Sequence, residues 1–279
     1  MAIDEVLKLS IPCLDGFVRL VDVMGDDSSI VQAARVSYGE GTKKIHEDRG
    51  LIRYLIRHQH WTPVEMVEFK FHVKLPVFIA RQWIRHRTAN VNEISARYSE
   101  MKDEIYLPPI EHISSQSNDN KQGRNSEPFA KEQAQEIQDL IMQSNENQYK
   151  IYQNLLDRGV ARELARTVLP VGHYTEWYWK IDLRNLMNFL ALRLDPHAQW
   201  EIRVYAEAMS SLVKQIVPIA WEAFEDYILN SVNFSKDEIE VIKEIINNTS
   251  FNIEDLSKEK GLKGRELVEF LSKLNHNHE

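Results

Sequence analysis

Residues 67–75 read Val-Glu-Phe-Lys-Phe-His-Val-Lys-Leu, and this stretch decides the fold of the chain. Apolar side chains occupy every second position from Val67 to Leu75, and charged or polar side chains occupy the positions between them. Because successive side chains of a β-strand point to opposite faces, the alternation predicts a strand with one buried and one polar face. Pro76 suits the first turn of a helix. That helix would carry Phe78, Ile79, Trp83 and Ile84.

Outward from this strand, the sequence predicts few strands and many helices. The β-branched run at residues 17–23 predicts a second strand, whereas the polar residues 111–128 predict an exposed, mobile loop. Without alternation of strands and helices, we expect an α+β domain in which helices pack on a small antiparallel sheet. Apolar spacing predicts helices at residues 30–37, 46–60, 129–158, 161–169, 183–194 and onward from 196.

The C-terminal residues differ in character from the rest. Ser235, followed three residues later by Glu238, is the pattern of a helix N-terminus. Two further short helices are expected through Leu256 and through residues 267–271. We therefore predict one domain at residues 1–230 and a helical C-terminal extension at residues 231–279.

Composition excludes several classes of protein. The formal net charge of −8 argues against binding of nucleic acid by the whole chain, which needs an excess of Lys and Arg. We expect no membrane span, since no stretch approaches about 18 consecutive apolar residues, and no signal peptide at Met1. A single cysteine, Cys13, excludes an internal disulfide. These features favour a cytoplasmic protein.

The densest polar cluster follows the predicted strand and helix directly. Residues 81–99 contain the four arginines Arg81, Arg85, Arg87 and Arg97, a side chain suited to phosphate and planar anions. Asparagine, glutamate and serine between them offer the mixed donors and acceptors that a nucleobase and sugar require. From the residues alone, a nucleotide site and an RNA-binding or solvated basic surface remain equally open.

Several motifs resemble the flavin-dependent thymidylate synthase family. The run Arg85-His86-Arg87, seven residues and then Ser95 is similar to the family's R-H-R-x7-S signature. The resemblance covers about residues 16–228. Further segments match in the expected order: Ala33-Ala-Arg-Val-Ser37, His60-x-Thr62-Pro63-x-Glu65, Ala165-Arg166-x-Val-Leu-Pro170 and Leu186-Met-Asn188 through His197-Ala-Gln-Trp200-Glu.

The resemblance implies an enzyme that converts deoxyuridine monophosphate (dUMP) to thymidylate (dTMP). Methylene-tetrahydrofolate would donate the carbon and yield tetrahydrofolate. FAD, reduced by NADPH, would supply the hydride, and no enzyme nucleophile would be needed. It also implies a homotetramer whose active sites are built from several subunits, with small molecules rather than nucleic acid or membranes as partners.

Carried over position by position, the resemblance assigns residues to three roles. Arg193, which would polarise the pyrimidine, and His60, near the flavin and folate, would be catalytic. The residues expected to contact dUMP are Gln82, Arg85, Glu93, Ile94, Ser95, Ala96, Arg97, Arg166 and Arg193. Those expected to contact FAD are Ser37, Thr62, Arg85, His86, Arg87, Glu93, Asp182, Arg184 and Asn188.

Two positions depart from the family pattern, and other features admit plainer interpretations. Asp182 stands where similar proteins carry Asn and cannot donate a hydrogen bond as an amide can. Ala96 replaces a frequent Gly, which is harmless if its φ is negative. His58 and His60 lack a common helical face and a third ligand, so we expect no metal site.

Two other classes of function stay open at this stage. One is a non-catalytic nucleic-acid-binding protein that uses the 81–97 cluster and the tail, and the other is a flavin or nucleotide enzyme of different specificity. Cys13 is interpreted as structural, and Trp177 and Trp179 as core residues. For His197, a functional role and a role as a capping or core histidine remain equally open.

Overall fold

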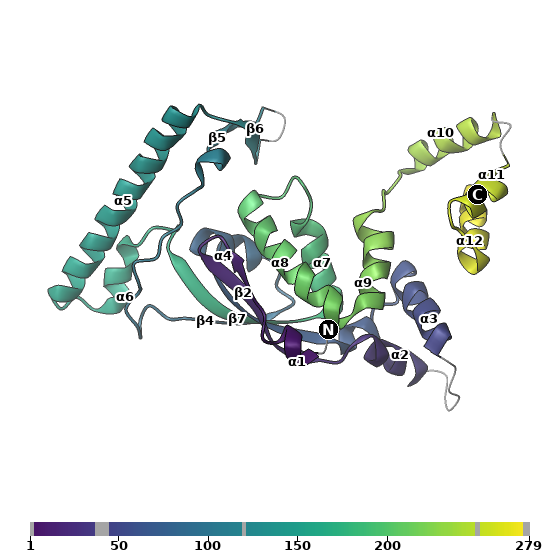
Figure 1. The fold of residues 1–279 in the computed structure, drawn as a ribbon, viewed down its shortest axis with the longest axis horizontal. Helices are drawn as coiled ribbons and strands as arrows, with labels where there is room; N and C mark the ends of the chain where they lie inside the picture. Colours follow the sequence, from purple (N-terminus) through teal and green to yellow (C-terminus); the bar gives the residue numbers. More distant parts are fainter. Residues whose placement is uncertain (1–2, 37–44, 119–120, 249–251, 276–279) are drawn as a thin grey trace. The chain divides into compact units, whose positions relative to one another are not determined.

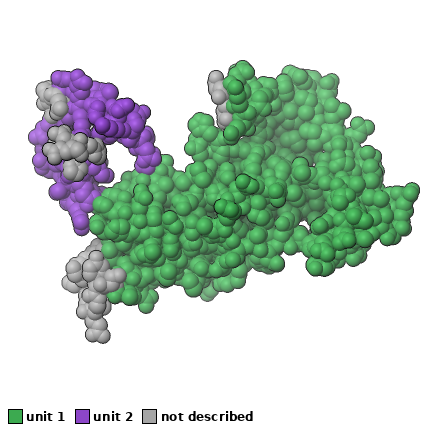
Figure 2. Space-filling model, turned by 180° about the vertical axis from the view of Figure 1, so that it is seen from behind, with its two compact units in different colours: residues 1–230 green, residues 231–279 purple. Residues whose placement is uncertain are grey.

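The computed structural model describes residues 3–36, 45–118, 121–248 and 252–275. By its internal contacts the chain divides into two compact units, Met1–Asn230 and Ser231–Glu279, coloured green and purple in Figure 2. None of the helices in the described ranges is both long and apolar enough to span a membrane.

Unit 1 is built on an antiparallel sheet in which the described strands follow the order β1-β2-β3-β7-β4. The side chains of Phe69, Phe71, Val73 and Leu75 on β3 are fully buried, and those between them are half-buried. The strand predicted from residues 67–75 is thus confirmed. The strands are β1 (Ser10–Cys13), β2 (Gly16–Met24), β3 (Glu68–Pro76), β4 (Asn90–Glu93) and β7 (Tyr174–Asp182).

Helices α4 (Val77–Trp83), α7 (Leu183–Arg193) and α8 (Trp200–Ile216) pack on the buried face of the sheet (Figure 1). Trp83 at the end of α4 lies at the centre of this core. Its ring is 5.3 Å from Trp179, 5.6 Å from Trp177 and 4.7 Å from Phe189 between centroids. This aromatic cluster fixes the end of α4, where the predicted Arg-rich motif begins.

The opposite face of the sheet carries a network of paired charges. Lys70 donates to Asp22 at 2.7 Å, and Lys180 to Glu68 at 2.6 Å. Opposite charges on neighbouring strands stabilise this face of the sheet, which stays polar. An α+β fold with a small antiparallel sheet packed by helices is therefore confirmed.

Apart from the short α1, which contacts α8, the remaining helices of unit 1 lie at either end of the sheet (Figure 1). At one end α3 packs on α9, and α2 contacts both. At the other end the long helix α5 contacts α6 and the short turns Ile110–His112 and Arg166–Val168. The bounds are α1 Ile3–Val6, α2 Asp27–Arg35, α3 Ile45–Arg57, α5 Lys131–Asp157, α6 Arg162–Ala165 and α9 Pro218–Phe224.

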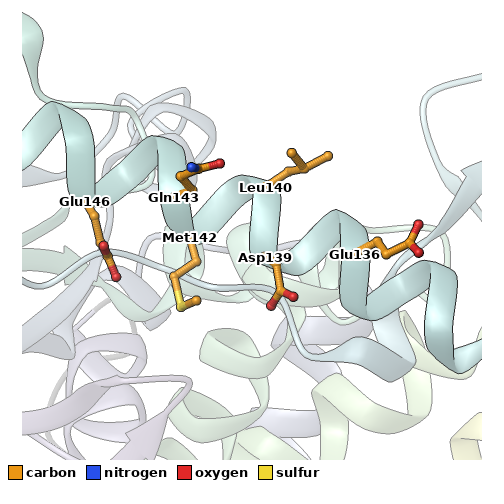
Figure 3. Close-up of a pocket in the computed structure, with 6 residues that line it drawn as sticks. All are labelled: Glu136, Asp139, Leu140, Met142, Gln143 and Glu146. Carbon is orange, nitrogen blue, oxygen red and sulfur yellow. The ribbon is translucent and has the colours of Figure 1, made fainter.

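Most of the surface of α5 is exposed in the single chain. Of its 27 residues, Ala134 and Tyr152 are buried. A shallow hollow runs along the helix between Glu136 and Glu146, with Leu140 and Met142 on different sides (Figure 3). Leu140 is 65% exposed and Met142 43% exposed, so this helix presents apolar surface that unit 1 alone does not cover.

Unit 2 consists of three helices within the described residues, as the sequence predicts. They are α10 (Lys236–Asn247), α11 (Ile253–Glu259) and α12 (Gly264–Asn275). The Ser235 hydroxyl accepts from Glu238 N, and the Glu238 carboxylate accepts from Ser235 N at 2.7 Å. The predicted capping pattern at Ser235 is confirmed.

Several sequence-based expectations are wrong in detail. Residues 111–128 are not a loop, since β5 (Ser114–Gln116) pairs with β6 (Arg124–Pro128). Helix α3 ends at Arg57, before the predicted break at residues 62–63, because Gln59 turns the chain with a φ of 57°. Helix α8 begins at Trp200, since an Asp195 turn separates it from α7. Strands β1, β4 and β7 were not predicted.

Candidate active site

The Arg85-His86-Arg87 segment leaves α4 directly after the buried Trp83. The His86 ring packs edge-on against Phe189 of α7, with 4.9 Å between centroids. Burial, and then the charge of Arg193, lowers the pKa of His86 to about 4, so this imidazole is neutral at physiological pH. A small pocket of about 190 Å³ adjoins the segment, lined by Ile84, His86, Arg87, Ala89, Val91, Trp177 and Trp179.

Arg193 is the last residue of α7 and is only partly exposed. Its Nε atom is buried and has no hydrogen-bond partner among the described residues. Burial also lowers the pKa of the Arg193 guanidinium, which remains charged because arginine titrates far above neutral pH. A buried N–H without an acceptor costs about 1–3 kcal/mol, so this position suits a ligand that accepts a hydrogen bond.

A second arginine of α7 has the same property. The Arg184 Nη1 atom donates to Glu65 Oε1 at 3.3 Å, whereas its buried Nε has no acceptor within the described ranges. Glu65 belongs to the short turn Val64–Met66, which follows Thr62. The hydrogen bond between Arg184 and Glu65 therefore places the start of α7 next to the turn that follows Thr62.

His60 is positioned by the way in which α3 ends. Gln59 adopts the left-handed conformation, and His60 N donates to Leu55 O at 2.8 Å, a pattern that commonly closes helices. The exposed His60 ring lies 5.6 Å from Tyr54 and 6.2 Å from His58 between centroids. The described residues contain no group of three or more His, Cys, Asp or Glu side chains placed to hold a metal ion.

Asp182 caps the first turn of α7. Its Oδ1 atom accepts from Asn185 N at 3.0 Å, and its Oδ2 atom accepts from Asn185 Nδ2 at 2.7 Å. Helix capping thus accounts for a carboxylate at this position. Asn188, one turn beyond Arg184 on the same helix, is exposed.

Strand β4 carries the predicted nucleotide-binding residues to the edge of the sheet. Glu93 Oε1 accepts from Thr175 Oγ1 at 2.6 Å, and Ile94 N donates to Glu176 O at 2.9 Å, so β7 fixes the end of β4. Ile94 is 45% exposed. Ala96 has a negative φ, because the described non-glycine residues with positive φ are Leu14 and Gln59, so its methyl group is compatible with the backbone.

The segment after Ser95 docks on α6. Arg97 N donates to Ser95 Oγ at 3.3 Å, and the Arg97 guanidinium pairs with Glu163 at 3.6 Å. Arg166 follows α6 directly and is exposed. The ion pair between Arg97 and Glu163 links the predicted dUMP residues of the segment 93–97 to α6, which Arg166 directly follows.

The predicted residues thus lie in three groups on unit 1. The first group consists of His60, Thr62 and the predicted residues at the start of α7. The second consists of the predicted residues at the end of α4 together with Arg193. The third consists of the segment 93–97 together with Arg166. Much of the third group is exposed in the single chain. Ser37, predicted to contact FAD, lies outside the described residues.

Sequence reasoning missed Gln199, which contacts a predicted site residue. Gln82 Nε2 donates to Gln199 Oε1. Beside Gln199 lies a polar cavity of about 700 Å³ between the β5–β6 hairpin and the loop before α8. The segment His197-Ala-Gln-Trp200-Glu could have pointed to Gln199, because it resembles the family. The resemblance assigns no role to Gln199.

Three plainer interpretations can now be judged. Trp177 and Trp179 are 2% exposed, which confirms them as core residues. Burial raises the pKa of the Cys13 thiol to about 12, and this buried side chain fits the structural interpretation. His197 is exposed and its Nδ1 atom lies 2.9 Å from Asp195 Oδ1, so it takes part in the turn before α8.

Comparisons with known proteins give this geometry a context. A family model described as thymidylate synthase complementing protein matches residues 19–219. A flavin-dependent thymidylate synthase from Rickettsia bellii is 54% identical over 258 residues, which cover 88% of each chain. One from Treponema denticola is 53% identical over 259 residues, which cover 93% of this chain and 94% of the relative.

A solved structure is also similar. The crystal structure of the UMP/dUMP methylase PolB from Streptomyces cacaoi, bound with 5-Br dUMP, superposes with a TM-score of 0.71 at 34% identity. The superposition covers 79% of this chain and 99% of that one.

The match to the Treponema relative also corrects one expectation. The match covers 93% of the chain, which is more than residues 1–230 make up, and so it extends into residues 231–279. The similarity therefore does not end near residue 228, as the motifs alone suggest. By its family model and by relatives more than half identical over most of their length, the chain belongs to the flavin-dependent thymidylate synthase family.

Proposed function

We propose that this chain methylates the uracil ring of dUMP to give dTMP, as a flavin-dependent methyltransferase. The observation that carries this proposal is Arg193, a partly buried guanidinium whose Nε lacks an acceptor among the described residues. Uracil and its anion are planar acceptors that such a group can bind. The neutral His86 ring beside Arg193 adds no competing positive charge.

Arg193 would act by stabilising negative charge on the pyrimidine. The ring carbon that receives the methyl group must gain carbanion character, and Cys13 is buried as a thiol and cannot add to the ring. A nearby positive charge favours the ionised imide by about 1–3 pKa units. The same contact persists as charge builds in the transition state.

The other dUMP contacts would come from two directions. Gln82 and Arg85 extend from the end of α4, whereas Arg97 pairs with Glu163 of α6 and Arg166 directly follows that helix. Arginines at these positions suit the phosphate, which accepts two parallel hydrogen bonds from one guanidinium. Glu93 through Ala96 would line the ribose and base.

The residues present fit FAD as the resident cofactor. The unpartnered Nε of Arg184 offers a donor, and Thr62, Asp182, Arg184 and Asn188 lie around the start of α7. Arg85, His86, Arg87, Glu93 and Ser37 would complete the site. When bound and reduced by NADPH, the flavin supplies the hydride that completes the methyl group, and methylene-tetrahydrofolate supplies the carbon. His60, exposed on the turn after α3, would orient the folate.

The active enzyme is proposed to be a homotetramer with shared active sites. The segment from Glu93 to Tyr98 carries predicted substrate contacts but is largely exposed in one chain, and Tyr98 is 79% exposed. Helix α5 exposes Leu140 and Met142 in the same way. Neighbouring subunits would cover these surfaces and close the site.

The test is a direct assay of the purified protein. We expect a flavin absorption band and conversion of dUMP to dTMP that requires methylene-tetrahydrofolate and NADPH. UMP is the alternative substrate to compare with dUMP, since the two nucleotides differ by one hydroxyl group. Absence of bound flavin after reconstitution with FAD, or turnover without the folate, would contradict the proposal.

A further inference from the structure

A glutamine pair connects a predicted dUMP contact to a part of the molecule that has no assigned role. Gln82 lies on the last turn of α4, and Gln199 directly precedes α8. The Gln82 Nε2 atom donates to Gln199 Oε1. Because an amide has distinct donor and acceptor ends, this bond selects one of the two orientations that Gln82 could adopt.

The loop that holds Gln199 is itself fixed by hydrogen bonds. It begins after Arg193, and Asp195 closes its first turn: Asp195 Oδ1 accepts from His197 N at 2.7 Å, and Asp195 O accepts from Ala198 N at 2.9 Å. Arg203 Nη1 donates to Pro196 O at 2.9 Å from the first turn of α8. The two predicted dUMP contacts Arg193 and Gln82 are therefore tied to opposite ends of one short, ordered loop.

The first turn of α8 is anchored in turn by a buried carboxylate. Glu201 is 3% exposed and accepts from Tyr106 Oη at 2.9 Å and from Arg124 Nη2 at 2.6 Å. Hydrogen bonds to a buried charged group are stronger than ordinary ones. Trp200 stacks on His112, with 3.6 Å between centroids. The β5–β6 hairpin thus fixes α8, and α8 fixes Gln199.

The side chain of Gln199 forms hydrogen bonds with two other side chains, those of Gln82 and of Glu201 in the first turn of α8. At the N-terminal boundary of α8 it forms no capping hydrogen bond, although polar side chains at this position commonly do. Its amide oxygen is directed to Gln82 instead. Gln199 therefore connects the Gln82 amide to the anchored carboxylate of Glu201.

We propose that Gln199 is a positioning residue for dUMP, which acts by holding the Gln82 amide in the orientation that the nucleotide requires. The inference rests on the proposed function, because Gln82 contacts dUMP only if dUMP is the substrate. Gln199 would not touch the reacting atoms. Its loss would therefore weaken binding of dUMP more than it slows the chemistry.

The test compares two substitutions on the holoenzyme. Gln199→Leu keeps the size but removes the acceptor, and we expect KM for dUMP to rise about three- to tenfold, the effect of one hydrogen bond, with kcat within twofold. Gln215→Leu, on the same helix with a bond to Ser211 O, is the matched control and should leave KM unchanged.

A double substitution separates positioning from direct contact. If Gln199 acts through Gln82, then Gln82→Leu combined with Gln199→Leu should raise KM no more than Gln82→Leu alone. Additive effects, or an unchanged KM in Gln199→Leu, would each overturn the inference. Failure of the unsubstituted enzyme to turn over dUMP would instead refute the proposed function, so the assay of the unsubstituted enzyme shows which of the two has failed.

Discussion

At the scale of the residue, the proposed function depends most on Arg193, the last residue of α7. We expect Arg193→Ala to lower the rate of methylation about ten- to a thousandfold, the effect of 1–3 pKa units on the ionised imide. Flavin should stay bound, because the proposed FAD contacts lie on other residues. Arg193→Lys retains the charge without the planar fork and should recover part of the rate.

Single-turnover oxidation of reduced flavin, with dUMP and methylene-tetrahydrofolate present, measures this step. A rate for Arg193→Ala close to that of the unsubstituted protein would remove Arg193 from the mechanism. Arg97, which pairs with Glu163, would then be the next residue to test.

Cys13 gives the complementary prediction. Its thiol is buried and its pKa is raised to about 12, so almost no thiolate exists at neutral pH. Cys13→Ala should leave dTMP formation within about twofold, and the rate should show no thiol titration between about pH 7 and 9. Loss of turnover in a variant whose circular dichroism is unchanged would indicate a covalent mechanism at Cys13 instead.

At the scale of the element, Asp182 combines a structural and a predicted functional role. Asn caps helices about as well as Asp, so Asp182→Asn should leave the melting temperature nearly unchanged, whereas Asp182→Ala should lose about 1 kcal/mol of stability. The introduced amide can donate to a ligand as the carboxylate cannot. We therefore expect Asp182→Asn to bind FAD more tightly, as measured by quenching of flavin fluorescence. Weaker binding with an intact cap would show that the carboxylate itself serves the site.

The elements differ in how far their sequences reveal them. β3 was predictable because Phe69, Phe71 and Val73 alternate with charged residues. β7 was not, because Trp177, Tyr178 and Trp179 are all aromatic, although Tyr178 lies on the opposite face and stacks on His72 with 4.8 Å between centroids. A strand with large aromatic residues on both faces has no period of two in its hydrophobicity.

The β5–β6 hairpin was unpredictable for a different reason. Its sequence is polar, and it is held by contacts with residues distant in the chain, above all that of Arg124 with Glu201. In the candidate site, the Arg85–Arg87 motif was recognisable from local sequence. The bond between Gln82 and Gln199 was not, because 117 positions separate the two residues.

At the scale of the whole molecule, α5 leads to a prediction about assembly. If neighbouring subunits cover its exposed apolar side chains, a buried charge there should cost several kcal/mol. Leu140→Glu and Met142→Glu should therefore dissociate the proposed tetramer and reduce activity. Asn154→Glu, at an exposed polar position of the same helix, is the control. Size-exclusion chromatography with light scattering measures the outcome, and an intact tetramer in both variants would exclude both side chains from the interface.

Unit 2 leads to a second prediction at this scale. Residues 1–230 contain the sheet, all three groups of predicted site residues and the whole of the segment matched by the family model. Removal of residues 235–279 should therefore preserve the proposed tetramer and the activity, with some loss of stability. Dissociation of the truncated protein on a sizing column would show that unit 2 belongs to the assembly.

The place of β7 in the sheet has a consequence for synthesis on the ribosome. β3 is complete at Pro76, but its neighbour β7 begins at Tyr174, about a hundred residues later. At about 5–20 residues per second, the growing chain carries β3 with one open edge for roughly 5–20 s. Open edges invite pairing with other chains, and charged side chains along a strand oppose it. We therefore expect Glu68, Lys70 and Lys74 to oppose such pairing of the nascent strand until its partner emerges.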